Sequence, residues 1–210
     1  MKGTTEAWDS YYGRNPVDWK GSPAPLPDMP SGSRMLDVGC GTGSSMLQAL
    51  EMGYEVVGID ISSRAVDRAR KRLVSRGFDA EVLVMNVMDD ISSLGPFDCI
   101  LLHHVLDSLP EKERGSAIGN CRQVLANRGI LSFQDLSTAD MRYGSGERIE
   151  RNTFRKKDGI FCHFFTEKEV RDLFFEMETL KLETIEWTQR TGTGRKRRSR
   201  IIGIFRDPRV

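Results

Sequence analysis

Residues 35–43, Met-Leu-Asp-Val-Gly-Cys-Gly-Thr-Gly, combine an acidic side chain with glycine at every second position. Glycine suits a turn in which the backbone approaches a ligand closely or adopts a positive φ. The preceding residues 34–38 are mostly apolar and predict a buried strand, and residues 44–52 predict a helix. The glycines therefore join a strand to the start of a helix, a position with free backbone N–H groups.

A second acidic residue, Asp60, ends the next predicted strand at residues 55–59 and lies 17 residues after Gly43. At this position of an α/β sheet, a carboxylate can accept hydrogen bonds from both hydroxyls of a ribose lying across the strand ends. The glycine turn and Asp60 together predict a nucleoside pocket.

Two kinds of nucleoside site compete at this point. A dinucleotide fold places Gly-x-Gly-x-x-Gly against a pyrophosphate. This chain has Gly-x-Gly-x-Gly instead, with Asp37 two residues before the first glycine. A carboxylate here repels a pyrophosphate and attracts an ammonium group, which favours a positively charged ligand.

Residues 36–43 resemble the first motif of the class I S-adenosylmethionine-dependent methyltransferases. The resemblance covers residues 34–135 with specific motifs and the closing strands only by their order. It implies S-adenosylmethionine as cofactor and S-adenosylhomocysteine as product. It also implies that Asp37 reaches the methionine amino group and that Asp60 binds the ribose. The remaining implied contacts are the turn residues Gly39, Cys40, Gly41 and Gly43 along the methionine chain, and Ile61 against the adenine.

The third predicted strand, residues 81–85, leads into Asn86 and Val87. Many members of the family have Asp at the position of Asn86, where the side chain accepts from the adenine amino group. Asn keeps an acceptor oxygen, so this hydrogen bond is retained. By the same resemblance, the Val87 N–H meets a ring nitrogen of the adenine.

His103 and His104 end the fourth predicted strand and are two of only three histidines in the chain. Strand ends line the crevice of such a sheet, so both are expected beside the transferable methyl group. His103 is a candidate general base. The alternative is that its backbone carbonyl holds the cofactor ammonium group while its ring packs. For His104, an orienting or packing role on the acceptor side is expected.

The methyl acceptor should contact two segments that lie over the strand ends, an N-terminal arm at residues 1–33 and an insertion at residues 135–165. The arm carries a run of aromatic residues, and the insertion mixes glycine, basic and aromatic residues. The alternative for the arm is that its aromatic residues cover the edge of the core. The acceptor-side candidates are Tyr11, Tyr12, Trp19, Tyr143, Phe154 and His163.

A small-molecule acceptor is the leading hypothesis, because the Asn/Asp-Pro-Pro-aromatic motif typical of amino-type DNA and protein-glutamine methyltransferases is absent after the fourth strand. The alternative is a tRNA-modifying methyltransferase, based on the basic residues 195–200, which we expect to form a hairpin turn. A solvated turn explains the same charges. A third hypothesis is a non-catalytic nucleoside-binding module.

Composition bears on the partners and the cellular location of the protein. The chain has 210 residues with 31 basic and 30 acidic side chains, so net charge alone does not favour nucleic acid. The chain has no apolar run of membrane-spanning length and no secretory signal. The four cysteines form no Cys-x-x-Cys pair, so we expect a cytoplasmic protein without a metal site. The sequence gives no indication of the oligomeric state.

The predicted elements alternate between strand and helix. Helices are expected at residues 63–76, 111–126 and 166–177, with Ser62 or Ser63 and then Thr166 as N-caps. Further strands are expected at residues 98–102, 129–133, 181–189 and 200–205. This order predicts an α/β, Rossmann-like open sheet of about seven strands over residues 34–210. The sheet should be mostly parallel, with a C-terminal antiparallel hairpin and helices on both faces.

Overall fold

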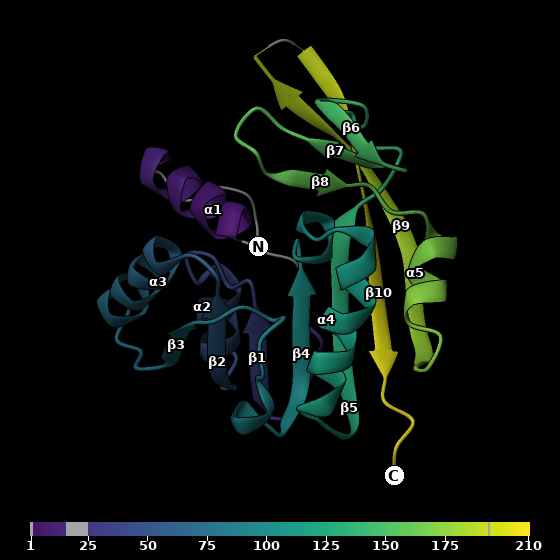
Figure 1. The fold of residues 1–210 in the computed structure, drawn as a ribbon. Coiled ribbons are helices and arrows are strands. Elements are labelled where there is room, and N and C mark those ends of the chain that lie inside the picture. Colours follow the sequence, from purple (N-terminus) through teal and green to yellow (C-terminus); the bar gives the residue numbers. More distant parts are fainter. Residues whose placement is uncertain (1, 16–24, 193) are drawn as a thin grey trace.

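A computed structural model describes residues 2–15, 25–192 and 194–210. Its centre is a seven-stranded sheet with the strand order β3-β2-β1-β4-β5-β10-β9 (Figure 1). The first five of these strands are parallel, and β10 is antiparallel to both β5 and β9. The predicted fold is therefore confirmed. The strands are β1 (Arg34–Val38), β2 (Glu55–Asp60), β3 (Glu81–Val84), β4 (Phe97–His103), β5 (Leu125–Leu136), β9 (Glu178–Thr191) and β10 (Gly194–Arg206).

Helices cover both faces of the sheet, because alternate side chains of each strand point to opposite faces. Met35 of β1 packs in the cluster that contains the buried residues of two helices, while its neighbour Leu36 packs in the cluster on the other face. The first face is covered by α2 (Ser44–Glu51) and α3 (Ser63–Ser75), and the second by α4 (Glu111–Gln123) and α5 (Glu167–Leu173). Two 3-10 turns are η1 (Ser92–Leu94) and η2 (Leu106–Ser108).

Two predicted helix caps are present. The Ser62 hydroxyl accepts a hydrogen bond from the Ala65 N–H at 3.2 Å, and the Thr166 hydroxyl accepts one from the Glu169 N–H at 3.3 Å. Each cap satisfies a backbone donor that the first helical turn leaves without a partner. These caps fix where α3 and α5 begin.

The N-terminal arm forms a helix, α1 (Lys2–Arg14), that packs beside α3 (Figure 1). The Asp9 carboxylate accepts from the Ser62 hydroxyl at 2.5 Å, and Arg68 of α3 donates to the Asn15 carbonyl at 2.7 Å. These contacts hold α1 over the carboxyl ends of β1 and β2. Trp19, one of the acceptor-side candidates, lies outside the described residues.

The segment at residues 135–165 contains regular structure that the sequence did not predict. It begins with the last residues of β5 and then forms a small antiparallel sheet in the order β6-β7-β8. The strands are β6 (Glu147–Glu150), β7 (Thr153–Arg155) and β8 (Phe161–His163). Strands of three or four residues are too short to produce a recognisable period of alternation.

The expectation that residues 195–200 form a turn is wrong. They belong to β10, which pairs with β9 as far as Gly194 and Thr191. Polar side chains occupy both faces of this distal part of the hairpin, so no apolar alternation marks it as strand. In the described part of the chain, no helix has the length and apolar character needed to cross a membrane.

Candidate functional site

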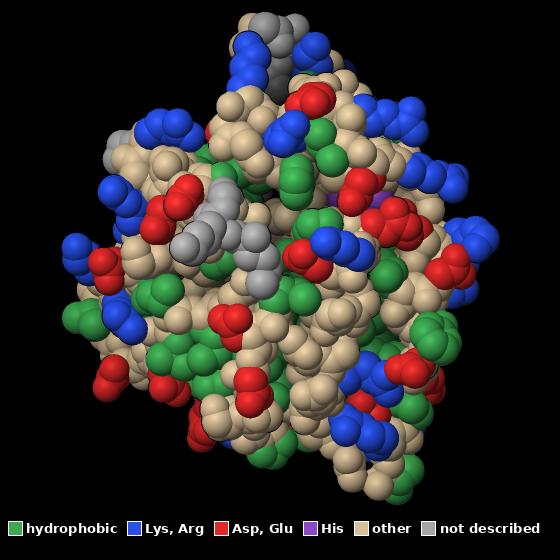
Figure 2. Space-filling view, viewed as in Figure 1, with side chains coloured by type: hydrophobic (Ala, Val, Ile, Leu, Met, Phe, Trp, Pro, Cys, Tyr) green, Lys and Arg blue, Asp and Glu red, His purple; other side chains and the backbone are tan. Residues whose placement is uncertain are grey.

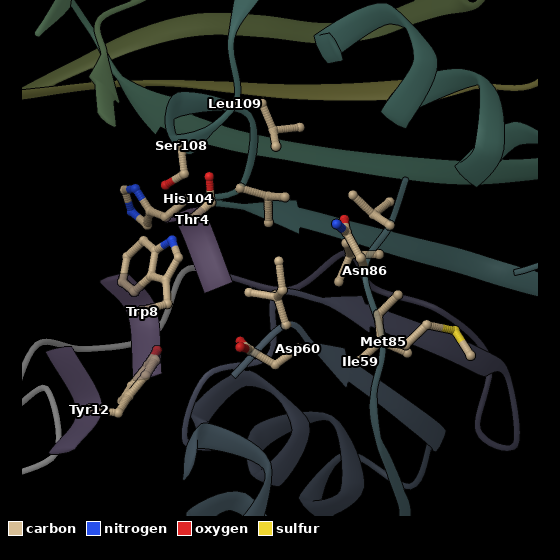
Figure 3. A pocket seen from close by; sticks show the side chains of 15 residues that line it. Thr4, Trp8, Tyr12, Ile59, Asp60, Met85, Asn86, His104, Ser108 and Leu109 are labelled. Carbon is tan, nitrogen blue, oxygen red and sulfur yellow. The ribbon is translucent and has the colours of Figure 1, made fainter. Parts of the chain in front are cut away.

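The carboxyl ends of β1, β2 and β4 meet α1 around a cavity of about 630 Å³ that opens to solvent (Figure 3). One end of the cavity is lined by residues that follow β2 and β3, and the other by α1 and the segment after β4. The cavity therefore lies where α/β sheets commonly bind ligands.

Asp60 joins the cavity to the glycine turn. Its Oδ2 accepts from the Gly41 N–H at 2.9 Å, and its Oδ1 accepts from the Ser62 N–H at 2.9 Å. Burial raises the pKa of this carboxyl, and the two backbone donors oppose that rise. Each carboxylate oxygen keeps a further lone pair. Asp60 can thus accept hydrogen bonds from two neighbouring hydroxyl groups, as the prediction of ribose binding requires.

Asp37 is buried beneath the glycine turn and is not among the residues that line the cavity. Its Oδ2 has no hydrogen-bond partner in the described part of the chain. Burial, together with the nearby Asp60, raises the pKa of the Asp37 carboxyl to about 7. A buried carboxylate without a partner is costly unless a cation or a donor reaches it. This site therefore fits a ligand that carries an ammonium group.

The glycine turn is enclosed tightly on two sides. Gly39 has a φ of +64°, and a Cβ there would lie 2.9 Å from Val105. Gly41 has a φ of +55°, and a Cβ there would lie 2.8 Å from the hydroxyl of Tyr12. Gly39 lines the cavity, whereas Cys40, Gly41 and Gly43 shape the turn without lining it. Any larger residue at Gly39 or Gly41 would displace an element that closes the cavity.

Ile61, Asn86 and Val87 all line the cavity, as the predicted adenine contacts require. The Asn86 Oδ1 accepts from the Met88 N–H at 3.0 Å, which holds the loop after β3 in place. A carbonyl oxygen has two lone pairs, so the same atom can accept a second hydrogen bond. The adenine roles of these three residues remain predictions.

The structure separates the two neighbouring histidines. The His103 ring contacts Ser132 of β5, with 2.9 Å between Nε2 and the hydroxyl, and is not among the cavity-lining residues. Burial, the neighbouring His104 and Arg200 lower the pKa of His103 to about 3. A ring so weakly basic makes a poor general base at neutral pH. This placement favours the alternative in which the His103 ring packs, and the role of its backbone carbonyl remains a prediction.

His104 lines the cavity beside Ser108 (Figure 3). Its Nδ1 lies 3.4 Å from Asp135 Oδ1, and its Nε2 lies 3.2 Å from the Gln134 side-chain nitrogen. Burial lowers the pKa of His104, but Asp135 and Asp107 outweigh this effect, so the pKa is raised overall. His104 is therefore the histidine that the structure brings to the acceptor side.

Of the other acceptor-side candidates, Tyr12 lines the cavity, and Tyr11 packs edge-on against it at 5.4 Å between ring centroids. Tyr143, in the turn before β6, packs against Phe154 of β7 at 5.3 Å between ring centroids, and neither residue lines the cavity. His163 is buried between Thr153 and Glu169, at 2.8 and 2.9 Å from their oxygens, and does not line it either.

Two cavity residues of α1, Thr4 and Trp8, were not predicted as site residues. Together with Tyr12 they recur at intervals of four along the helix, which places them on one face (Figure 3). This spacing is visible in the sequence, but it indicates a shared helix face only once residues 2–14 are known to be helical. Ser108 and Leu109 were also missed, because a 3-10 turn gives no periodic pattern.

Comparison with known proteins bears on the activity of this chain. Residues 35–129 match the family model described as "Methyltransferase domain". The solved structure of a SAM-dependent methyltransferase from Methanosarcina mazei superposes with a TM-score of 0.69 and 26% identity, covering 85% of this chain and 94% of that one. Both findings support a class I S-adenosylmethionine-dependent methyltransferase. S-adenosylmethionine is its cofactor.

Two curated relatives of this methyltransferase have names that include an RNA acceptor. The chain is 31% identical over 194 residues to the tRNA N(3)-methylcytidine methyltransferase Mettl2 of Drosophila melanogaster, covering 79% of this chain and 58% of the relative. It is 26% identical to the tRNA N(3)-methylcytidine methyltransferase trm141 of Schizosaccharomyces pombe, covering 97% of this chain and 90% of the relative. The chain thus spans little more than half of the Drosophila protein and most of the yeast one.

Proposed function

We propose that this methyltransferase transfers the methyl group of S-adenosylmethionine to RNA, with N3 of a tRNA cytidine as the acceptor atom. The two tRNA-modifying relatives support this acceptor. The feature of the structure that supports it most is a pair of facing arginines on the β9–β10 hairpin, Arg190 and Arg195, which can hold an anion between them.

Arg190 and Arg195 are directly opposite each other on the paired strands β9 and β10. Like charges in this cross-strand position repel and are destabilising unless an anion lies between them. Both side chains are exposed, and neither has a carboxylate partner among the described residues. Figure 2 shows Lys and Arg side chains gathered around the free end of this hairpin, at the top of the view. A phosphate group of RNA would relieve the repulsion.

The other arginines of the same run have protein partners. Arg197 pairs with Glu186 at 2.5 Å, and Arg198 pairs with Asp140 at 3.0 Å. Trp187 lies beneath the guanidinium groups of Arg198 and Arg200. These contacts stiffen the hairpin and leave Arg190 and Arg195 as its candidates for phosphate binding.

On the donor side, Asp60 would hold the ribose hydroxyls and Asp37 the methionine ammonium group. Ile61, Asn86 and Val87 would hold the adenine, and the turn of Gly39, Cys40, Gly41 and Gly43 would follow the methionine chain. When bound, the sulfonium supplies an already activated methyl group. The protein then has to align the acceptor with that group and exclude competing water. The helix face of Thr4, Trp8 and Tyr12 closes the cavity over this position.

A small-molecule acceptor, the leading hypothesis from sequence, has no support among the curated relatives named above. The test that separates it from RNA uses radiolabelled S-adenosylmethionine, the full chain and total tRNA. We expect label in RNA that ribonuclease releases, and 3-methylcytidine after digestion to nucleosides. Label that resists ribonuclease, or that appears only in a small-molecule fraction, would refute the proposal.

A further inference from the structure

At the acceptor end of the cavity, the carboxylates of Asp107 and Asp135 lie next to the ring of His104. A ring nitrogen of His104 and carboxylate oxygens of Asp107 and Asp135 lie within 4.8 Å of one another. The Asp107 N–H donates to Asp135 Oδ2 at 3.3 Å, and the Ser108 hydroxyl donates to Asp107 Oδ1 at 3.1 Å. Of the three, only His104 lines the cavity, while Asp135 is fully buried and Asp107 nearly so.

The backbone holds His104 in this position at some cost. Its φ of +60° lies in the left-handed region, which residues other than glycine seldom adopt. The His104 N–H donates to the Gln134 carbonyl at 2.8 Å, which anchors it to β5. Strained residues of this kind are found at functional sites, where the surrounding structure enforces them.

Asp135 is also incompletely satisfied. Its Oδ1 has no hydrogen-bond partner in the described part of the chain and lies 3.4 Å from His104 Nδ1. The neighbouring Gln134 likewise has a buried side-chain oxygen without a partner. A fully buried carboxylate oxygen directed at the back of a cavity-lining histidine indicates a group that acts through that histidine.

We propose that His104 contacts the acceptor base and that Asp107 and Asp135, acting through it as positioning residues, stabilise the positive charge that the acceptor ring nitrogen gains on methylation. This inference rests on the proposed function, because it concerns the acceptor of the same reaction. It adds a statement about the chemistry of the acceptor. The negative charge at this end of the cavity favours a neutral ring nitrogen that becomes positively charged when it is methylated.

The chemistry needs no proton transfer. The lone pair of the ring nitrogen forms the new N–C bond, the S–C bond breaks with its electrons left on sulfur, and the positive charge moves from sulfur to the acceptor ring. In a poorly solvated site, fixed negative charge stabilises the transition state most strongly where positive charge develops. The two carboxylates supply such charge on the acceptor side.

Other charged or titratable groups also surround the cluster. Those that interact with His104, Asp107 or Asp135 are His103, Arg114, Arg142 and Cys162. Burial and Asp107 raise the pKa of Asp135 to about 8, while His104 opposes the rise. Since the pKa of His104 is raised as well, the pair retains a proton near neutral pH and loses it at higher pH. The cluster then gains one negative charge.

Two measurements on the full chain test this inference. The first is the turnover of tRNA methylation against pH, for the parent, Asp135→Asn and the control Asp172→Asn, an exposed residue of α5. We expect the parent rate to rise about tenfold through the titration of the pair. Asp135→Asn removes that charge, so its rate should equal the parent rate at low pH and stay there as the pH rises. A merely structural role would lower the rate at every pH without changing the profile.

The second measurement does not depend on activity. In the presence of S-adenosylhomocysteine, calorimetry compares the binding of 3-methylcytidine, which is cationic at neutral pH, with that of cytidine. We expect the preference of the parent for the cation to increase about tenfold once the pair has lost its proton at higher pH, and Asp135→Asn to show no such increase. His104→Asn should show no increase either, and asparagine tolerates the same left-handed backbone, so folding is preserved.

The outcomes separate the two proposals. A parent that prefers 3-methylcytidine but methylates no RNA would support the acceptor-end charge and refute the RNA acceptor. A parent that methylates RNA but binds both nucleosides equally would refute the inference while leaving the proposed function intact. Loss of activity with a chelator, restored by a divalent cation, would also refute it, because a metal ion would then neutralise the carboxylates.

Discussion

The backbone N–H of Gly41 donates a hydrogen bond to Asp60 Oδ2 at 2.9 Å, across 19 residues of sequence. The glycine turn after β1 and the acid at the end of β2 are therefore one unit. A change in Asp60 affects both the proposed ribose contact and the shape of the turn.

Replacing Asp60 should weaken cofactor binding. Asp60→Ala removes both acceptor oxygens, and we expect a loss of about 1–3 kcal/mol in the binding free energy of S-adenosylmethionine, measured by calorimetry. Asp60→Asn keeps one acceptor oxygen and should lose less. An Asp60→Ala affinity equal to that of the parent would exclude the ribose assignment.

Cofactor affinity should depend on pH through Asp37. The pKa of its carboxyl is raised to about 7. In the cofactor-free protein this raised pKa contributes stability that is complete below the unfolded value and is lost as the pH rises through about 7. The cofactor ammonium group needs the ionised form, so affinity should increase from pH 6 to 7.5, by at most about tenfold per pH unit.

Asp37→Asn supplies the control for this pH dependence, because its side chain does not titrate. Its affinity should be low and nearly constant over the same range, whereas the exposed Asp172→Asn should behave like the parent. Parallel pH profiles for the parent and Asp37→Asn would show that another group is responsible.

Gly41→Ala should destabilise the docking of α1. The substitution places a Cβ at a φ of +55° and 2.8 Å from the Tyr12 hydroxyl. Gly77→Ala is a matched control, since Gly77 has a φ of +81° with no atom within 4 Å of the added Cβ. Urea unfolding should show a larger loss in the free energy of unfolding for Gly41→Ala than for Gly77→Ala, with a total loss of about 1–3 kcal/mol for Gly41→Ala. Adding Tyr12→Phe to Gly41→Ala should reduce the difference in unfolding free energy between the two glycine variants. Equal losses of stability in Gly41→Ala and Gly77→Ala would contradict the close approach of Gly41 to the Tyr12 hydroxyl.

The anion position on the hairpin predicts a change in salt dependence. Arg195→Ser should weaken tRNA binding and reduce the slope of log affinity against log salt concentration by about 1. Arg76→Ser, at the C-terminal end of α3 where Arg76 pairs with Glu51, should leave the slope unchanged. Filter binding across a salt series measures both, and an unaltered slope in Arg195→Ser would argue against a phosphate at this position.

The sequence predicted the donor half of the site because its parts are local. Asp37, Gly39 and Asp60 each sit at a fixed step of a strand–turn–helix unit whose apolar pattern is strong. The acceptor half could not be predicted in the same way, because His104, Asp107 and Asp135 come together only when β5 pairs with β4. Sequence alone could not separate His103 from His104 either, since the left-handed backbone at His104 decides which ring enters the cavity.

The length of the β9–β10 hairpin imposes a size requirement on the acceptor. The last residue of β10 that pairs with β5 is Arg200, opposite Leu136, and Arg195 stands five residues further out. At about 3.3 Å per residue, this places the arginine pair roughly 17 Å beyond the end of β5. An acceptor that uses both the cavity and the arginines must span that gap. A free nucleoside is too short to do so, so the proposed use of both positions requires a polymeric acceptor.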